Sequence, residues 1–250
     1  MKYQGIFITG TDTGVGKTVV SAALLSVLRS AGMDAVPMKP VQTGATRRSG
    51  RWRSPDLDFC LALAGLQPGP VEYARMAPCC FAKACSPHLA AAVAGRCIRL
   101  RRLTACFQTL KARHAMVVVE GVGGVCVPIQ GRQTMLDLMG ALDLPVVVVA
   151  RLGLGTINHT LLTLHCLRRA QVRVLGVVFN ATRPGRLLYR AGQYQNHCTV
   201  GICTRARPLA VYSGSGDIVS RSILSRGGRL PAARGGLAEM VAIVNTVTEE

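Results

Sequence analysis

The 250-residue chain has few acidic residues, few aromatic residues and no long apolar segment. Twelve aspartates and glutamates stand against 30 lysines and arginines, a formal net charge of +18, and aromatic residues make up 4%. No apolar run approaches the roughly 20 residues of a membrane span, and the N-terminal residues do not read as a signal peptide. The composition, 49% hydrophobic and 17% charged, is typical of a globular protein. We therefore expect a cytoplasmic protein without a membrane partner, folded as a single domain over residues 1–250.

The ten cysteines include no Cys-x-x-Cys pair, so we expect reduced thiols and no structural metal. The excess positive charge is concentrated in three arginine clusters: Arg47, Arg48, Arg51 and Arg53; Arg96, Arg99, Arg101 and Arg102; and Arg183, Arg186 and Arg190. A charge of this size favours nucleic acid or acidic surfaces as partners. Because we read these arginines as not interleaved with aromatic residues, we interpret the clusters as solvated faces and expect no nucleic-acid partner.

The most informative stretch is residues 9–18, Thr-Gly-Thr-Asp-Thr-Gly-Val-Gly-Lys-Thr. It follows a short apolar run and precedes apolar residues at helical spacing, which predicts strand, glycine loop and helix. Gly14 and Gly16 allow the backbone amides to turn inward around a phosphate chain at the N-terminus of the helix. Lys17 would contact the outer phosphates, and the Thr18 hydroxyl would hold magnesium. The spacing is a variant of the strict phosphate-loop pattern, with Thr11 at the position of its first glycine.

Three further polar residues each follow an apolar segment that is predicted as a strand: Lys39, Glu120 and Asn180. Ligands of open α/β sheets bind at the carboxyl ends of the strands, so we expect Lys39 and Glu120 beside the phosphate loop. Glu120 would reach magnesium there, directly or through water. Asn180 either pairs with the edge of a nucleotide base or forms a turn.

Two connecting segments also carry candidate groups. Residues 45–55 are predicted as a polar loop, and the helix after Ser54 begins with Asp56 and Asp58, which serve either the helix dipole or magnesium. Residues 151–159 are predicted as a loop before a helix over 160–167, and the amides at the start of that helix offer an anion site. An amphipathic helix is expected over 100–113.

Seven stretches together resemble the dethiobiotin synthetase family: residues 10–18, 39–44, 54–58, 86–88, 119–124, 155–159 and Asn180. The resemblance implies an α/β fold of the P-loop NTPase type, with three layers and a parallel sheet flanked by helices. It also implies a ligase of biotin biosynthesis that uses ATP and Mg2+. Its reaction would carboxylate 7,8-diaminopelargonic acid (7,8-diaminononanoate) with CO2 and close dethiobiotin, releasing ADP and phosphate.

The resemblance assigns roles to individual residues. Lys17 and Lys39 would be catalytic. ATP would contact Thr13, Gly14, Val15, Gly16, Lys17, Thr18 and, through adenine, Asn180. Magnesium would be held by Thr18, Asp56 and Glu120. The diamine or its carbamate would touch Thr11 and Thr43, and its distant carboxylate would reach Gly155, Thr156 and Asn158 of a second subunit, which implies a homodimer.

Beyond Pro184 the resemblance ends, and residues 185–235 read as a diverged segment rich in Arg, Ser and Gly. Two alternatives to a dethiobiotin synthetase stay open. One is another phosphate-loop enzyme, such as a cobyrinate amidase-like ligase or a partition-type ATPase, although residues 11–15 lack the early lysine of partition ATPases. The other is a non-catalytic protein that binds a nucleotide or nucleic acid through its basic surface.

Overall fold

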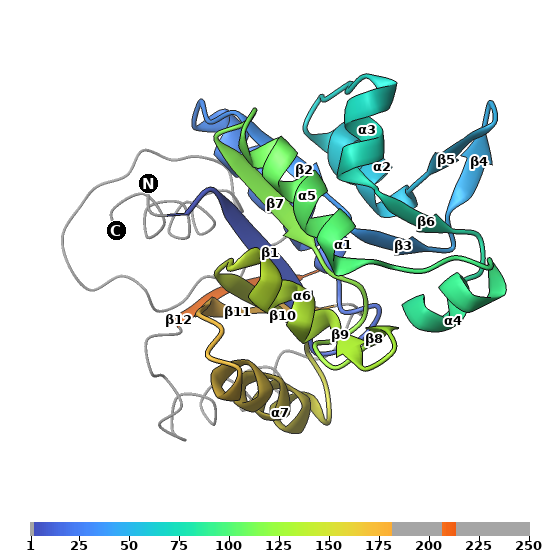
Figure 1. Cartoon of the computed structure of the whole chain (residues 1–250). Coiled ribbons are helices and arrows are strands. Elements are labelled where there is room, and N and C mark those ends of the chain that lie inside the picture. The colour runs from blue at the N-terminus through green and yellow to red at the C-terminus, as the bar shows by residue number, and fades with distance from the viewer. Residues whose placement is uncertain (1–2, 182–206, 214–250) are drawn as a thin grey trace.

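A computed structural model describes residues 3–181 and 207–213 of the chain. Its centre is a six-stranded sheet in the order β12-β11-β10-β1-β7-β2, and all neighbouring strands are parallel (Figure 1). The strands are β1 (Gly5–Gly10), β2 (Ala35–Met38), β7 (Met116–Glu120), β10 (Val146–Arg151), β11 (Val174–Ala181) and β12 (Arg207–Ser213). The continuous apolar runs form these strands because both faces of the sheet are covered.

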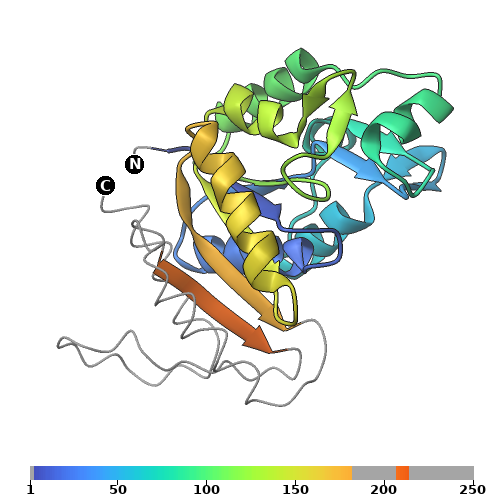
Figure 2. The same ribbon diagram turned by 90° about the horizontal axis from the view of Figure 1, so that it is seen from below.

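Helices cover both faces of the sheet, which confirms the predicted three layers. They are α1 (Lys17–Ser30), α2 (Pro55–Leu63), α3 (Pro70–Met76), α4 (Pro87–Val93), α5 (Leu100–Lys111), α6 (Met135–Leu142) and α7 (Thr156–Arg169). Alternate residues of β1 enter different cores: Ile6 and Ile8 pack in one with Leu24 of α1, and Phe7 packs in the other with Phe107 of α5. Figure 2 shows α7 and the outermost strand β12, which lies beside β11. None of the helices in the described part of the chain has the length and hydropathy of a membrane-spanning segment.

Six shorter strands lie outside the central sheet. β3 (Val41–Thr43) pairs in parallel with β6 (Cys79–Phe81), β4 (Thr46–Arg48) forms a hairpin with β5 (Arg51–Arg53), and β8 (Pro128–Gln130) pairs with β9 (Gln133–Thr134). The prediction of a loop over 45–55 is therefore wrong. Ser49 and Gly50 have φ values of 49° and 73°, the left-handed pair that a tight hairpin turn requires.

Two other boundaries differ from the predictions. The helix expected over 160–167 begins four residues earlier, at Thr156, because Gly155 adopts a left-handed conformation and caps it. Strand β12 falls within residues 185–235, where no strand over 207–213 was predicted. The helix expected over 100–113 is confirmed as α5, with Leu103, Phe107 and Leu110 buried. The third arginine cluster lies outside the described residues.

Candidate active site

The phosphate loop connects β1 to α1 at the carboxyl edge of the sheet. Gly14 and Gly16 have φ values of 75° and 97°, and Gly16 is the N-cap of α1. The Lys17 ammonium folds back over the loop and donates a 2.8 Å hydrogen bond to the Asp12 carbonyl. Lys17 is only 7% exposed. Its burial, with the charge of Lys39 nearby, lowers the pKa of Lys17 to about 8.

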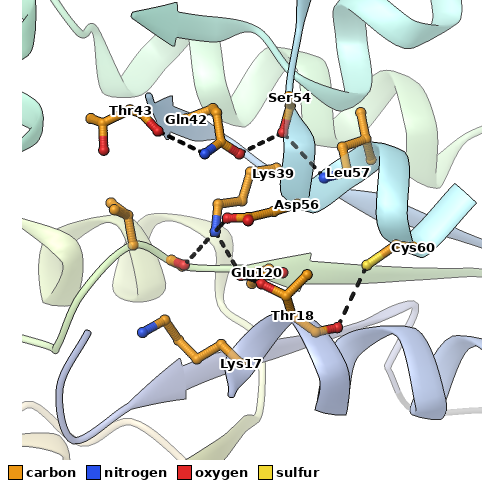
Figure 3. A network of polar contacts seen from close by, with 12 residues as sticks. Lys17, Thr18, Lys39, Gln42, Thr43, Ser54, Asp56, Leu57, Cys60 and Glu120 are labelled. Atoms are coloured by element: carbon orange, nitrogen blue, oxygen red, sulfur yellow. Dashed lines mark hydrogen bonds and ion pairs between the residues drawn. The ribbon is translucent and has the colours of Figure 1, made fainter. Parts of the chain in front are cut away.

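Lys39 stands directly after β2 and joins two carboxylates from different elements (Figure 3). Its ammonium lies 2.6 Å from Glu120 Oε1, at the end of β7, and 2.6 Å from Asp56 Oδ2, in the first turn of α2. It also donates to the Gly121 carbonyl at 3.2 Å. The Thr18 hydroxyl donates to the same Glu120 oxygen at 2.9 Å. The predicted meeting of Lys39, Glu120 and the phosphate loop at one edge of the sheet is confirmed.

Burial alone would lower the pKa of Lys39, but Glu120 and Asp56 outweigh that effect and raise it above the ordinary lysine value. The two carboxylates therefore favour the charged form of Lys39. Lys17, which lacks an equally close carboxylate, titrates near the physiological range. The two buried lysines of the site thus differ in charge state at mildly alkaline pH.

A second network fixes the start of α2 and therefore the position of Asp56. The Ser54 hydroxyl donates to Gln42 Oε1 at 2.6 Å and accepts from the Leu57 amide at 3.2 Å (Figure 3). The Tyr73 hydroxyl accepts from the Ser54 amide and donates to Asp58, both at 2.8 Å. Sequence reasoning missed Gln42 and Tyr73, because only the tertiary fold brings them to this helix end.

The two acidic residues of α2 have different partners. Asp58 forms a bidentate ion pair with Arg53, at 2.7 and 3.1 Å, and accepts from Tyr73. Asp56 faces Lys39 instead. Only Asp56 is therefore directed into the site, and Asp58 serves the hairpin and the helix.

Asn180 lies at the C-terminal end of β11, where it contacts the phosphate loop. Its side-chain nitrogen donates to the Val15 carbonyl at 2.9 Å, and it is 6% exposed. A Cβ added at Gly16 would overlap this nitrogen, so glycine is required there for packing as well as for backbone conformation. An asparagine amide has two N–H donors and a carbonyl acceptor, so the bond to Val15 uses only part of its hydrogen-bonding capacity.

The residues expected to contact the substrate occupy three environments. The buried Thr11 hydroxyl has no hydrogen-bond partner among residues 3–181 and 207–213, and Thr43 is half-buried at the end of β3. Gly155 and Asn158 are exposed at the start of α7. Thr156 is fully buried, and its hydroxyl donates a 2.6 Å bond to the Arg151 carbonyl. Its side chain stabilises the turn and presents no open face to a ligand in this chain.

The oxygen groups at the sheet edge fit a small divalent cation. Within the described residues, no group of three or more His, Cys, Asp or Glu side chains gathers as a metal cluster. Magnesium does not require one, because it binds through one or two carboxylates, a hydroxyl, water and substrate phosphates. The Thr18 hydroxyl and the carboxylates of Asp56 and Glu120 form such a set: both carboxylates contact the Lys39 ammonium, and the hydroxyl donates to Glu120.

Sequence comparisons identify relatives over most of the chain. The model of a family described as an AAA domain matches residues 4–223, which extends beyond Pro184. An ATP-dependent dethiobiotin synthetase BioD of Anaeromyxobacter sp. (strain K) is 42% identical over 221 residues, covering 88% of this chain and 94% of the relative. The protein of the same name from Xanthomonas campestris pv. campestris (strain ATCC 33913) is 42% identical over 185 residues, covering 74% and 81%.

Solved structures show the same fold at low sequence identity. MinD from Pyrococcus horikoshii OT3, a septum site-determining protein complexed with Mg-ADP, aligns with a TM-score of 0.51 and 17% identity over 83% of this chain and 80% of that one. The MinC:MinD cell division complex of Aquifex aeolicus aligns with a TM-score of 0.52 and 13% identity, covering 84% and 80%. Together with the family match, these structures confirm the predicted α/β fold class of the P-loop NTPase type.

Proposed function

Because the chain belongs to the ATP-dependent dethiobiotin synthetase family, we propose that it carboxylates 7,8-diaminopelargonic acid with CO2 and closes the cyclic urea of dethiobiotin. Family membership makes the chain an ATP-using ligase of biotin biosynthesis. The proposal adds its substrates, its site residues and its products, which include ADP and phosphate.

The observation that carries this proposal is the convergence of Lys17, Thr18, Lys39, Asp56 and Glu120 at one sheet edge. A reaction between a carbamate and a triphosphate brings anionic groups together, and their repulsion must be offset by buried cations. Lys39 contributes one such cation, because Glu120 and Asp56 raise its pKa and favour its charged form. Lys17 lies in the phosphate loop, and its pKa is lowered because burial disfavours its charged form. The phosphates of ATP would supply an anionic partner that stabilises this charge.

The proposed chemistry assigns each group a task. One amine of the diamine adds to CO2 and loses a proton, which gives a carbamate beside Lys39 and the unpartnered Thr11 hydroxyl. A carbamate oxygen then attacks the γ-phosphorus, and ADP leaves with Lys17 near its phosphates. The second amine attacks the carbamoyl carbon and loses a proton, and phosphate leaves as the urea ring closes. Throughout, Lys39 would offset the negative charge on the transferred phosphoryl group.

Thr18, Asp56 and Glu120 would hold magnesium in this site. The ion would offset charge on the ATP phosphates and orient them. The Pyrococcus horikoshii MinD structure that shares this fold was solved with Mg-ADP, which supports the combination of metal and nucleotide. Val15 and the remainder of the loop from Thr13 would surround the phosphates.

The adenine of ATP and the distant carboxylate of the diamine have proposed sites as well. Asn180 would read adenine with the amide groups that its bond to Val15 leaves available. Gly155 and Asn158 would bind the distant carboxylate of the diamine in the active site of a second copy, so the working enzyme would be a homodimer. The 82% exposure of Leu154 beside them supports a loop that reaches outward.

The test is formation of dethiobiotin from the diamine, bicarbonate, ATP and MgCl2, followed by mass spectrometry together with ADP release. The expected product requires every component, and removal of magnesium with EDTA stops the reaction. Lys17→Met and Lys39→Met should each lower turnover by about two to three orders of magnitude, as loss of a group that stabilises developing charge does. Lys111→Met, at the end of α5, is the matched control and should retain full turnover.

Unchanged dethiobiotin formation in both active-site variants would refute the assigned roles. ATP hydrolysis by the wild-type protein that is independent of the diamine, without any dethiobiotin, would favour another phosphate-loop enzyme. Light scattering of the purified chain checks the dimer separately from the chemistry.

A further inference from the structure

A cavity lies outside the candidate active site. It has a volume of about 550 Å3 and is bounded by the β4–β5 hairpin, strand β6 and helix α4, which lie on the same side of the central sheet (Figure 1). We call it the arginine cleft. Its lining combines three cations, two aromatic rings and an apolar wall: Arg47, Trp52, Phe81, Lys83, Val93 and Arg96. None of the residues assigned to ATP, magnesium or the diamine lines it.

The positive charge of the cleft is not neutralised by the part of the chain that the structure describes. No aspartate or glutamate lines the cavity, and Arg47, Lys83 and Arg96 form no ion pair with any described residue. Arg53, on the neighbouring strand of the hairpin, differs because Asp58 pairs with it at 2.7 Å. The fold brings Arg47 and Arg96, one member of each of two arginine clusters that are more than forty residues apart in the sequence, to one cavity. An anion bound there would relieve their mutual repulsion.

Aromatic rings orient two of these cations. The Arg47 guanidinium carbon lies 4.8 Å from the centre of the Trp52 ring, and that of Arg96 lies 5.0 Å from the centre of the Phe81 ring. Arg96 also donates a 3.0 Å bond to the Cys80 carbonyl. Stacking fixes the plane of a guanidinium and leaves N–H groups at its edge for an anion such as phosphate. The prediction that these arginines are not interleaved with aromatic residues is wrong, because Trp52 lies between Arg51 and Arg53 in the sequence and rings contact Arg47 and Arg96 in the fold.

From this arrangement we propose that the arginine cleft binds a nucleotide, either free or as one unit of a single strand. An inorganic anion would need the cations but not the aromatic and apolar walls, which include Val93 at 65% exposure. An uncharged ring would need the walls but not three cations. A nucleotide uses both, through phosphate contacts with the cations and through stacking of its base on Trp52, because Phe81 is only 1% exposed. A volume of about 550 Å3 is within the usual range of small-ligand sites.

Trp52 makes the proposal directly testable, because it is the one tryptophan of the 250 residues. Titration with AMP should change its fluorescence saturably, whereas adenosine or inorganic phosphate over the same range should not. Arg47→Gln and Arg96→Gln should each raise the AMP dissociation constant about tenfold, the typical effect of losing one charge-assisted hydrogen bond. Arg168→Gln, an exposed arginine of α7, is the matched control and should leave the AMP dissociation constant unchanged. Calorimetry on the same proteins measures binding independently of Trp52.

A short single-stranded oligonucleotide distinguishes the two sources of the nucleotide. Binding that is much tighter than that of AMP and falls steeply with salt identifies a strand. Equal affinity for the two probes identifies a free nucleotide. The proposal is overturned if neither probe binds saturably, or if the cleft variants bind as the wild type does. It is also overturned if Lys17→Met abolishes the AMP signal, because the signal then comes from the phosphate loop. Dethiobiotin formation tests the proposed function separately from all of these outcomes.

Discussion

Replacement of Lys17 by methionine should stabilise the nucleotide-free protein while it removes ATP binding. Lys17 is 7% exposed, and its pKa is lowered from 10.5 to about 8, mainly by burial. A difference of about 2.5 units corresponds to about 3 kcal/mol, at about 1.36 kcal/mol for each unit. Methionine keeps the length and apolar contacts of the side chain without the buried charge. We therefore expect the free energy of unfolding at pH 7 to rise by about 3 kcal/mol.

The pH dependence of this gain has a defined sign. The pKa of Lys17 is lower in the folded state than in the unfolded state, so its proton disfavours folding. The destabilisation is complete below pH 8, where both states are protonated. It declines as the pH rises from 8 to 10.5, because the folded state releases its proton first. The stability difference between variant and wild type should therefore be constant below pH 8 and shrink over this window.

Urea unfolding at a series of pH values, with calorimetry for ATP binding, measures both effects. Lys111→Met is the control, and as a substitution remote from the site it should change stability by no more than about 0.5 kcal/mol. A Lys17→Met protein that is less stable than the wild type would contradict the buried-charge argument. So would a stability gain that does not change between pH 8 and pH 10.5.

Three further predictions concern the same site. Lys39→Met should lower the free energy of unfolding by about 3 to 5 kcal/mol, because Glu120 stays buried without its cation, and adding Glu120→Gln should recover much of this loss in urea unfolding. Gly16→Ala should lower the free energy of unfolding by about 1 to 3 kcal/mol, because residue 16 has a left-handed backbone conformation. It should also weaken ATP binding in calorimetry, because the added Cβ displaces Asn180. Unchanged stability and ATP binding would refute the contact between residue 16 and Asn180. The affinity of the wild type for ATP should fall above pH 8 as Lys17 loses its proton. Between pH 8 and 10, ATP binding should be accompanied by proton uptake by Lys17. Calorimetry in buffers of different ionisation enthalpy measures that uptake.

The parallel sheet and its functional edge could be predicted because both follow from local patterns. Continuous apolar runs indicate strands buried on both faces, and the carboxyl ends of parallel strands share one edge. Lys39, Glu120 and Asn180 each follow such a run, and the structure places all three at that edge. Their approximate meeting point therefore needed no knowledge of side-chain packing.

Contacts between distant segments could not be predicted in this way. Asp56 and Asp58 share the first turn of α2, and local pattern alone does not distinguish them, although the family resemblance assigns magnesium to Asp56. In the fold, Arg53 and Tyr73 bind Asp58, and this leaves Asp56 to pair with Lys39. The arginine cleft escaped prediction for the same reason, since its two halves meet only after β6 and α4 are placed against the hairpin.

The two lysines show why burial alone does not determine the chemistry of this site. Lys39 has two carboxylate oxygens at 2.6 Å, which raise its pKa, whereas the closest partner of Lys17 is the neutral Asp12 carbonyl, and its pKa falls. Two lysines against Asp56 and Glu120 leave no net positive charge. Side chains of this cluster therefore cannot by themselves neutralise a triphosphate and a carbamate. The amides of the phosphate loop, the N-terminus of α1 and a divalent cation would have to supply the remaining positive potential. A site with this charge balance is suited to phosphates that arrive together with their metal.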